Sequence, residues 1–243
     1  MLIFKYENKK KDKIMRLTIY TSIILFLSFT GCYGQTKYFE VTDIIDKTEE
    51  LAKKVEWTLL KDKERIDGYT RVGDSIFGGE IACNISPIKN ADAPTFAVYP
   101  GSKYARDKNR VYYPILVKCV DYEDCGVCYY EKVIVEKANP SNFQYLGKDY
   151  ARDNQHAYFR GQLIKGADGN TFKLVEGPEY LYFATDKNSV YSHNKVFEDA
   201  DPSTFYYKKD SRGNNPSEAD SKYIIGDKNT KWEHIPPDQI KKL

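Results

Sequence analysis

Short aromatic and apolar segments alternate with polar turns along most of this chain. In residues 104–113 (YARDKNRVYY), Tyr104 and Ala105 lead into Asp-Lys-Asn, and the chain leaves through Val111, Tyr112 and Tyr113. This pattern is typical of two strands joined by a tight turn. Related stretches occur at residues 150–159 (YARDNQHAYF) and 183–192 (FATDKNSVYS). The pattern therefore predicts a series of β-hairpins.

The hairpins belong to a longer repeat. The turn aspartates, with a degenerate first copy at Asp74, are separated by 33, 46, 33 and 41 residues, which indicates a period of about 33 residues with two insertions. Aspartate can bond the backbone that follows it, and asparagine tolerates the left-handed conformation that hairpin turns use. The predicted turn residues are Asp107, Asn109, Asp153, Asp186, Asn188, Asp227 and Asn229.

A second element repeats in phase with the hairpins. It reads ADAPTF from Ala91, ANPSNF from Ala138, ADGNTF from Ala167 and ADPSTF from Ala200. Each copy starts a turn and supplies one phenylalanine to the interior. The predicted core phenylalanines are Phe96, Phe143, Phe172 and Phe205.

These patterns predict a mainly β fold of repeated antiparallel hairpin units preceded by one N-terminal α-helix. The helix is expected within residues 42–60, where Ile44, Leu51, Val55 and Leu59 have nearly helical spacing and Thr42 is an N-cap candidate. We expect three regions: a signal region at 1–35, an N-terminal segment with the helix at 36–66, and the β-repeat domain at 67–243. A solenoid, an open meander and a sandwich would all produce this repeat.

Composition supports the β assignment and excludes one class of partner. Aromatic residues make up 14% of the chain, with 21 tyrosines, and tyrosine fits half-buried strand positions. The formal net charge is only +2, so we predict no nucleic-acid partner.

The N-terminal region predicts export. An apolar run at residues 17–29, interrupted by polar residues, follows several lysines and is too short and mixed for a membrane-spanning helix. Residues 29–32 (FTGC) resemble the lipobox of bacterial lipoproteins, except that Phe29 stands where leucine is usual. The resemblance implies a lipid on Cys32 and a membrane anchor. Cleavage after Gly34 or Gln35 is the alternative and would release a secreted protein, and either Met1 or Met15 could be the start.

Four further cysteines, Cys83, Cys119, Cys125 and Cys128, form an even set in a compartment expected to be oxidising. Disulfides are the favoured interpretation, with Cys125 bonded to Cys119 or Cys83 rather than to Cys128. A redox pair at Cys125 and Cys128 and a zinc site of four thiolates are the alternatives.

No catalytic constellation is present in the sequence, and we predict no enzyme activity, cofactor or metal. His156, His193 and His234 occur singly and are expected at the surface. The nearest approaches to a calcium loop, at Asp168 and Asn170 and at Asp199 and Asp201, are equally explained by turn formation.

The motif Asp-Lys-Asn followed by tyrosines, at residues 107–113 and 186–192, resembles that of the DKNYY family, a bacterial group of unknown function. The resemblance spans roughly residues 69–232 and implies no catalytic residues. We therefore expect an exported, lipid-anchored envelope protein that binds a protein or glycan ligand or gives structural support. The alternatives are an envelope thiol-disulfide or metal-binding protein, and an immunity-type protein that neutralises a toxin or hydrolase.

Overall fold

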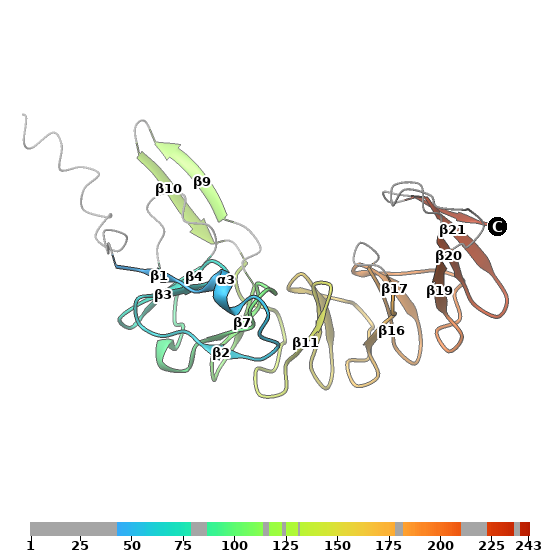
Figure 1. Ribbon diagram of the computed structural model, residues 1–243, viewed down its shortest axis with the longest axis horizontal. Helices are drawn as coiled ribbons and strands as arrows, with labels where there is room; N and C mark the ends of the chain where they lie inside the picture. The colour runs from blue at the N-terminus through green and yellow to red at the C-terminus, as the bar shows by residue number, and fades with distance from the viewer. Residues whose placement is uncertain are drawn as a thin grey trace, which may run out of the picture.

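A computed structural model of the protein describes residues 43–78, 87–113, 117–122, 125–130, 132–177, 182–209, 223–235 and 239–243. This part of the chain is built mainly of β-strands, which confirms the predicted fold class. Five four-stranded sheets and one two-stranded hairpin succeed one another. Figure 1 shows the sheets in a row along the long axis of the molecule, in chain order from blue to red.

The first two sheets share the N-terminal segment. The first has the order β1-β3-β4-β5 and the second β2-β6-β7-β8. Strand β1 is parallel to β3, whereas the other neighbours in both sheets are antiparallel. Strands β1, β2 and β3 precede residue 67, so the N-terminal segment contributes strands to both sheets. The first sheet comprises β1 (Ile45–Asp46), β3 (Glu64–Ile66), β4 (Tyr69–Val72) and β5 (Ser75–Phe77), and the second β2 (Thr58–Leu59), β6 (Ala97–Val98), β7 (Ala105–Arg106) and β8 (Val111–Tyr112).

The N-terminal helix is much shorter than its sequence pattern suggested. Within residues 43–60, the described part of the predicted segment, only α3 (Thr48–Leu51) is helical, because Ile45 pairs with Glu64 in β1 and Thr58 pairs with Val98 in β2. Val55 is 83% exposed, so it does not belong to an apolar helix face. Tertiary strand pairing has overridden local helical periodicity here. Thr42 lies outside the described residues.

The three C-terminal sheets are antiparallel meanders with their strands in chain order. The third sheet contains the hairpin of residues 150–159 (YARDNQHAYF), and the fourth contains the hairpin of residues 183–192 (FATDKNSVYS). Their strands are β11 (Gln144–Gly147), β12 (Tyr150–Arg152), β13 (Ala157–Phe159) and β14 (Gln162–Leu163); β15 (Lys173–Leu174), β16 (Phe183–Thr185), β17 (Val190–Ser192) and β18 (Lys195–Val196); and β19 (Tyr206–Lys209), β20 (Tyr223–Gly226), β21 (Lys231–Ile235) and β22 (Gln239–Lys242).

The insertion behind the 46-residue spacing contains a separate hairpin. Strands β9 (Val117–Tyr122) and β10 (Cys125–Tyr130) pair only with each other among the described strands. The chain leaves the second sheet after Tyr113 and returns at Val133, whose carbonyl accepts a hydrogen bond from the Tyr113 amide at 2.9 Å. In Figure 1 the hairpin projects away from the row of sheets.

The core is aromatic and continues from sheet to sheet. Phe96, Phe143 and Phe172 are buried, whereas Phe205 is half-buried beside Phe183 and Trp232 in the last cluster. Tyrosines fill much of the remaining interior. The largest completely buried tyrosines are Tyr69, Tyr104, Tyr112, Tyr150, Tyr158 and Tyr191.

Three of these tyrosines link consecutive sheets. Tyr69 and Tyr150 begin the strand that precedes the turn of their unit, and Tyr104 immediately precedes such a strand. The hydroxyl of each donates to the carbonyl just before the corresponding strand of the next sheet. Because the rings are buried and the bonds are directional, these tyrosines hold neighbouring units at a set spacing. The bonds are Tyr69 to Lys103 O (3.1 Å), Tyr104 to Asp149 O (3.2 Å) and Tyr150 to Tyr182 O (2.7 Å).

Gly169 marks another close contact between units. A Cβ at this position would lie 2.4 Å from Asp153 O and 2.5 Å from His156 N. The position thus admits only glycine, because the second element of one unit packs directly against the motif turn of the preceding one. This explains why ADGNTF carries glycine where the other copies differ.

Candidate functional site

The recurrent aspartates are densely hydrogen-bonded in the described part of the chain. Asp107 Oδ1 accepts the amides of Asn109 (2.7 Å) and Arg110 (2.8 Å), and Oδ2 accepts the Tyr112 hydroxyl (2.7 Å) and the Asp92 amide (2.8 Å). The side chain is only 3% exposed. A buried carboxylate is stable only when its lone pairs are bonded, and here four donors surround it.

The same arrangement recurs in the next two units. Asp153 Oδ1 accepts two following amides at 2.7–2.8 Å and Asp186 Oδ1 does the same, while Oδ2 accepts the tyrosine hydroxyl five residues on. Asp227 keeps the two turn amides but has Trp232 in place of the tyrosine. The fourth carboxylate is thus held by backbone donors only.

The second element is hydrogen-bonded to the first. In every unit the amide of its second residue donates to Oδ2 of the motif aspartate, which explains why the two patterns repeat in phase. Sequence reasoning found both patterns but not this bond. The donor amides belong to Asp92, Asn139, Asp168 and Asp201, at 2.8, 3.0, 2.7 and 2.7 Å respectively.

These bonds shift the ionisation of the network. Burial opposes ionisation of Asp153, but the amides of Gln155 and His156 and its other donors outweigh burial and lower its pKa. The balance is the same at Asp227, where amides alone lower the pKa. Burial, with the bonded Asp186 carboxylate, raises the pKa of Tyr191 to about 12. Burial, with the Asp153 carboxylate, also raises the pKa of Tyr158, so at neutral pH the unit of Asp153 joins a carboxylate to a neutral phenol.

A surface ion pair accompanies the network in three units. Lys108 pairs with Asp92 (2.8 Å), Lys187 with Asp168 (2.6 Å) and Lys228 with Asp201 (2.8 Å). In the remaining unit both partners are asparagine, Asn139 and Asn154. The lysine of Asp-Lys-Asn is therefore the partner of the acid in the second element.

One part of the turn prediction was wrong. Asn109, Asn188 and Asn229 are not among the residues with positive φ in the described chain. The aspartate side chain bonds both following amides, and its own amide donates to the carbonyl three residues on, so the turn needs no left-handed residue. Asp74, the degenerate copy, lies exposed in the β4–β5 turn and lacks the network.

The calcium-loop candidates serve as turn formers. Asp168 Oδ1 accepts the Asn170 amide (3.1 Å) and Asp201 Oδ1 accepts the Ser203 amide (2.9 Å). Among the described side chains, no group of three or more His, Cys, Asp and Glu is gathered to hold a metal.

The histidines lie in unlike environments. His156 is half-buried, with Nδ1 3.6 Å from Asp153 Oδ1. His193 stacks on Tyr182 with ring centroids 5.0 Å apart. The side chain of His234 lies outside the described part.

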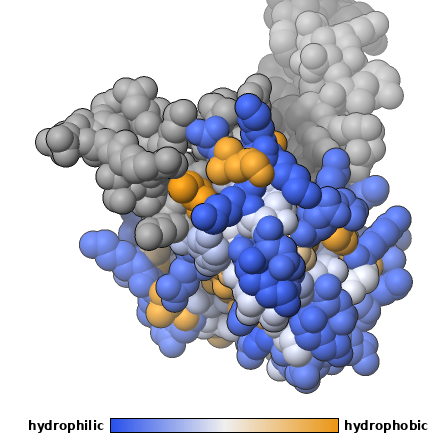
Figure 2. Space-filling model, turned by 90° about the vertical axis from the view of Figure 1, so that its right-hand side faces the viewer, coloured by the Kyte–Doolittle hydropathy of each residue, from blue (hydrophilic) through white to orange (hydrophobic). Residues whose placement is uncertain are grey.

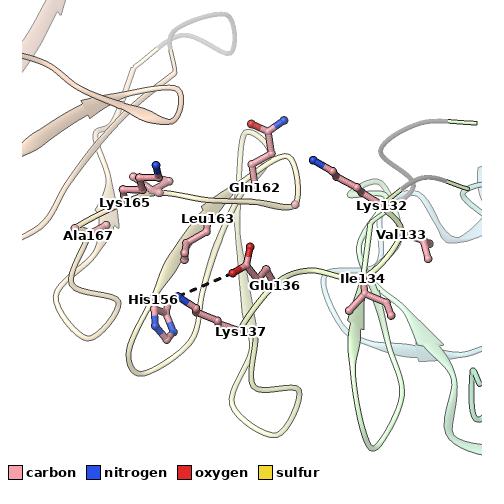
Figure 3. A pocket seen from close by; sticks show the side chains of 13 residues that line it. Lys132, Val133, Ile134, Glu136, Lys137, His156, Gln162, Leu163, Lys165 and Ala167 are labelled. Carbon is pink, nitrogen blue, oxygen red and sulfur yellow. Dashed lines mark ion pairs between the residues drawn. The ribbon is translucent and has the colours of Figure 1, made fainter.

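An open groove of about 1160 Å³ lies beside His156. Figure 3 shows its labelled side chains coming from two segments, one containing Lys132 and Lys137 and the other containing Leu163 and Lys165. The lining has three lysines and one glutamate, Glu136, whose Oε1 is 4.0 Å from Lys137 Nζ. This combination suits an acidic group attached to an apolar one. No sequence pattern indicates this groove, because the two segments that line it are about 30 residues apart.

At the C-terminal end of the row of sheets the described surface is predominantly polar. Figure 2, which views the C-terminal end, shows a mostly hydrophilic described surface with small, separate apolar patches. No helix in the described residues has the length and apolar character needed to cross a membrane.

The structure describes the cysteines only in part. Cys32 and Cys83 lie outside the described residues. Cys119, Cys125 and Cys128 lie in β9 and β10, where Cys119 pairs with Cys128 and Cys125 with Tyr122 in the strand register.

Comparison with known proteins agrees with the repeat. The model of the DKNYY family matches residues 118–195 and again residues 150–236, which assigns this part of the chain to the DKNYY family. The unit of Asp107 precedes both matches yet has the same four-donor network, so the repeat extends further toward the N-terminus. Comparisons with curated proteins and with solved structures found no match.

Proposed function

We propose that the protein is an exported module, anchored to a bacterial cell envelope through Cys32, that binds a protein or glycan partner or supports structure without chemistry of its own. The observation that carries this proposal is the use of the recurrent acids. Both oxygens of Asp107, Asp153 and Asp186 accept bonds from the fold itself. The acids that define the repeat therefore have a structural role, because their oxygens are already hydrogen-bonded within the fold.

The row of sheets supports a binding role. Repeat arrays present extended surfaces to partners, and each unit needs its neighbours for stability. The groove beside His156 is a concave site that we would assign to a partner, and its lysines favour an acidic one.

Charge reversal in the groove tests the binding role. The full chain would be immobilised and exposed to envelope extract, with Lys165→Glu as the groove variant and Lys195→Glu, at an exposed position in β18, as the matched control. We expect a retained partner that is lost with Lys165→Glu only. Equal capture by both variants would remove the groove from the proposal.

Export and anchoring rest on the sequence of residues 17–32 and need their own test. The intact mass of the protein from its own membranes should correspond to a chain that begins at Cys32 and carries acyl groups. Cys32→Ser should abolish acylation and release the protein from the membrane. A chain that begins near Thr36 would contradict the anchor, and a full-length chain would contradict export.

A further inference from the structure

Among the described strands, β9 and β10 form the one pair to which no third strand is added. It forms a sheet of two strands, and among the described strands none is added to either edge. Figure 1 shows it projecting from the array. A two-stranded hairpin alone in water is marginally stable at best, so six paired positions need a further constraint.

The register places two cysteines where a constraint can form. Cys119 and Cys128 are direct partners in the antiparallel ladder. Directly opposite residues have Cα atoms about 4.5–5.5 Å apart. Disulfides span Cα distances of about 4.4–6.8 Å, so this pair meets the requirement without movement of the backbone.

Cys125 does not meet this distance requirement with Cys119 or with Cys128. It pairs with Tyr122 and lies three positions from Cys128 along an extended strand. Three residues of strand cover about 10 Å. A Cα separation above about 7 Å cannot be bridged in place, so the register disfavours both Cys125–Cys128 and the Cys125–Cys119 pairing that the sequence favoured.

We infer that Cys119 and Cys128 form a disulfide that staples the projecting hairpin, with Cys125 left outside this bond. The reaction is thiol-disulfide exchange with a disulfide oxidant such as oxidised glutathione. The Cys119 thiolate attacks the oxidant to form a mixed disulfide and releases one thiol, and the Cys128 thiolate then displaces the second. Two protein thiols become one disulfide, and one oxidant disulfide becomes two thiols.

The inference relies on the proposed export only for its oxidant, so the test supplies one. The reduced full chain would be incubated with oxidised glutathione, its free thiols alkylated in denaturant, and the chain digested with a protease that cleaves after aspartate and glutamate. Cleavage at Asp121, Glu123 and Asp124 separates Cys119 from Cys125 and Cys128. Fragmentation of the linked peptide then identifies the partner.

We expect Cys119 linked to Cys128 in the wild type and equally in Cys125→Ser. In Cys119→Ser, Cys128 should be alkylated. Amide exchange in residues 117–130 should accelerate on reduction, because the hairpin loses its staple. Alkylation of both Cys119 and Cys128, or a link from Cys119 to Cys125, would overturn the inference whether or not the protein is exported.

Discussion

The hydroxyl of Tyr158 donates a hydrogen bond to Asp153 Oδ2 at 3.0 Å, across the turn between β12 and β13. Tyr112 and Asp107 make the same bond at 2.7 Å, and Tyr191 and Asp186 at 2.9 Å. This bond explains why a tyrosine follows the motif aspartate by five residues in each of these three units. The acid orders the turn through one oxygen and joins the following strand and the next element through the other, so it acts as a structural centre of each unit.

Truncation of the core phenylalanines should separate buried from half-buried positions. Phe143→Ala removes a completely enclosed ring and should lower the free energy of unfolding by about 3–5 kcal/mol. Phe205→Ala should cost less, because that ring is half-buried. Urea unfolding of both variants measures the difference. Equal losses would contradict the packing of the last unit.

The contacts between units should be unequal in strength. The Tyr104 hydroxyl donates to Asp149 O and also accepts the buried Gly161 amide at 2.8 Å. Tyr104→Phe leaves that amide without its acceptor, at a cost of about 1–3 kcal/mol. Tyr150→Phe removes a bond to a carbonyl, and the His193 amide beside this hydroxyl keeps Tyr182 O as its acceptor, so the change should cost about 1 kcal/mol. The reverse order in thermal melting would show that the hydroxyls do not link the units as described.

Acid should weaken the fold through the motif carboxylates. In the folded chain the pKa of Asp153 lies below its ordinary value of 3.8, so the folded state binds protons less readily than the unfolded state. The stabilisation is complete above about pH 4 and is lost as the pH falls through the lowered folded pKa. Melting temperature measured from pH 7 to pH 2.5 should fall mainly below pH 4. Asp153→Asn should melt lower at pH 7 but lose less on acidification, and an unchanged slope would contradict this.

The unit without an ion pair offers a test of the pairing rule. Asn139→Asp with Asn154→Lys would install the pair found in the other units and should stabilise the chain by about 0.2–1 kcal/mol, as exposed pairs do. Neither single variant should gain as much. A double-mutant cycle in low and high salt measures the coupling, which should shrink with salt. Zero coupling at low salt would show that the pairs are incidental.

Much of this fold could be predicted from the sequence, because the repeat places identical chemistry at fixed separations. Asp107 and its counterparts identified the turns, and the phenylalanines of the second element identified the interior. The exchange of Asp92 and Lys108 for Asn139 and Asn154 was also visible, but without a structure nothing indicated that these positions meet.

The remaining features depend on tertiary geometry. Residues 45–59 have helical spacing, yet two short strands in this segment complete separate sheets. The groove beside His156 joins segments from both sides of a hairpin. The pairing of Cys119 with Cys128 depends on a register that the spacing of cysteines alone does not fix.

The most direct test of the account is the stability of Asp186→Asn beside Asp74→Asn. Asparagine at position 186 retains one acceptor oxygen and adds a donor among four donors, whereas position 74 is an exposed turn. We predict that urea unfolding shows a loss of about 1.5–3 kcal/mol for Asp186→Asn and almost none for Asp74→Asn. Equal stability of the two variants would contradict the claim that the recurrent acids hold the repeat together.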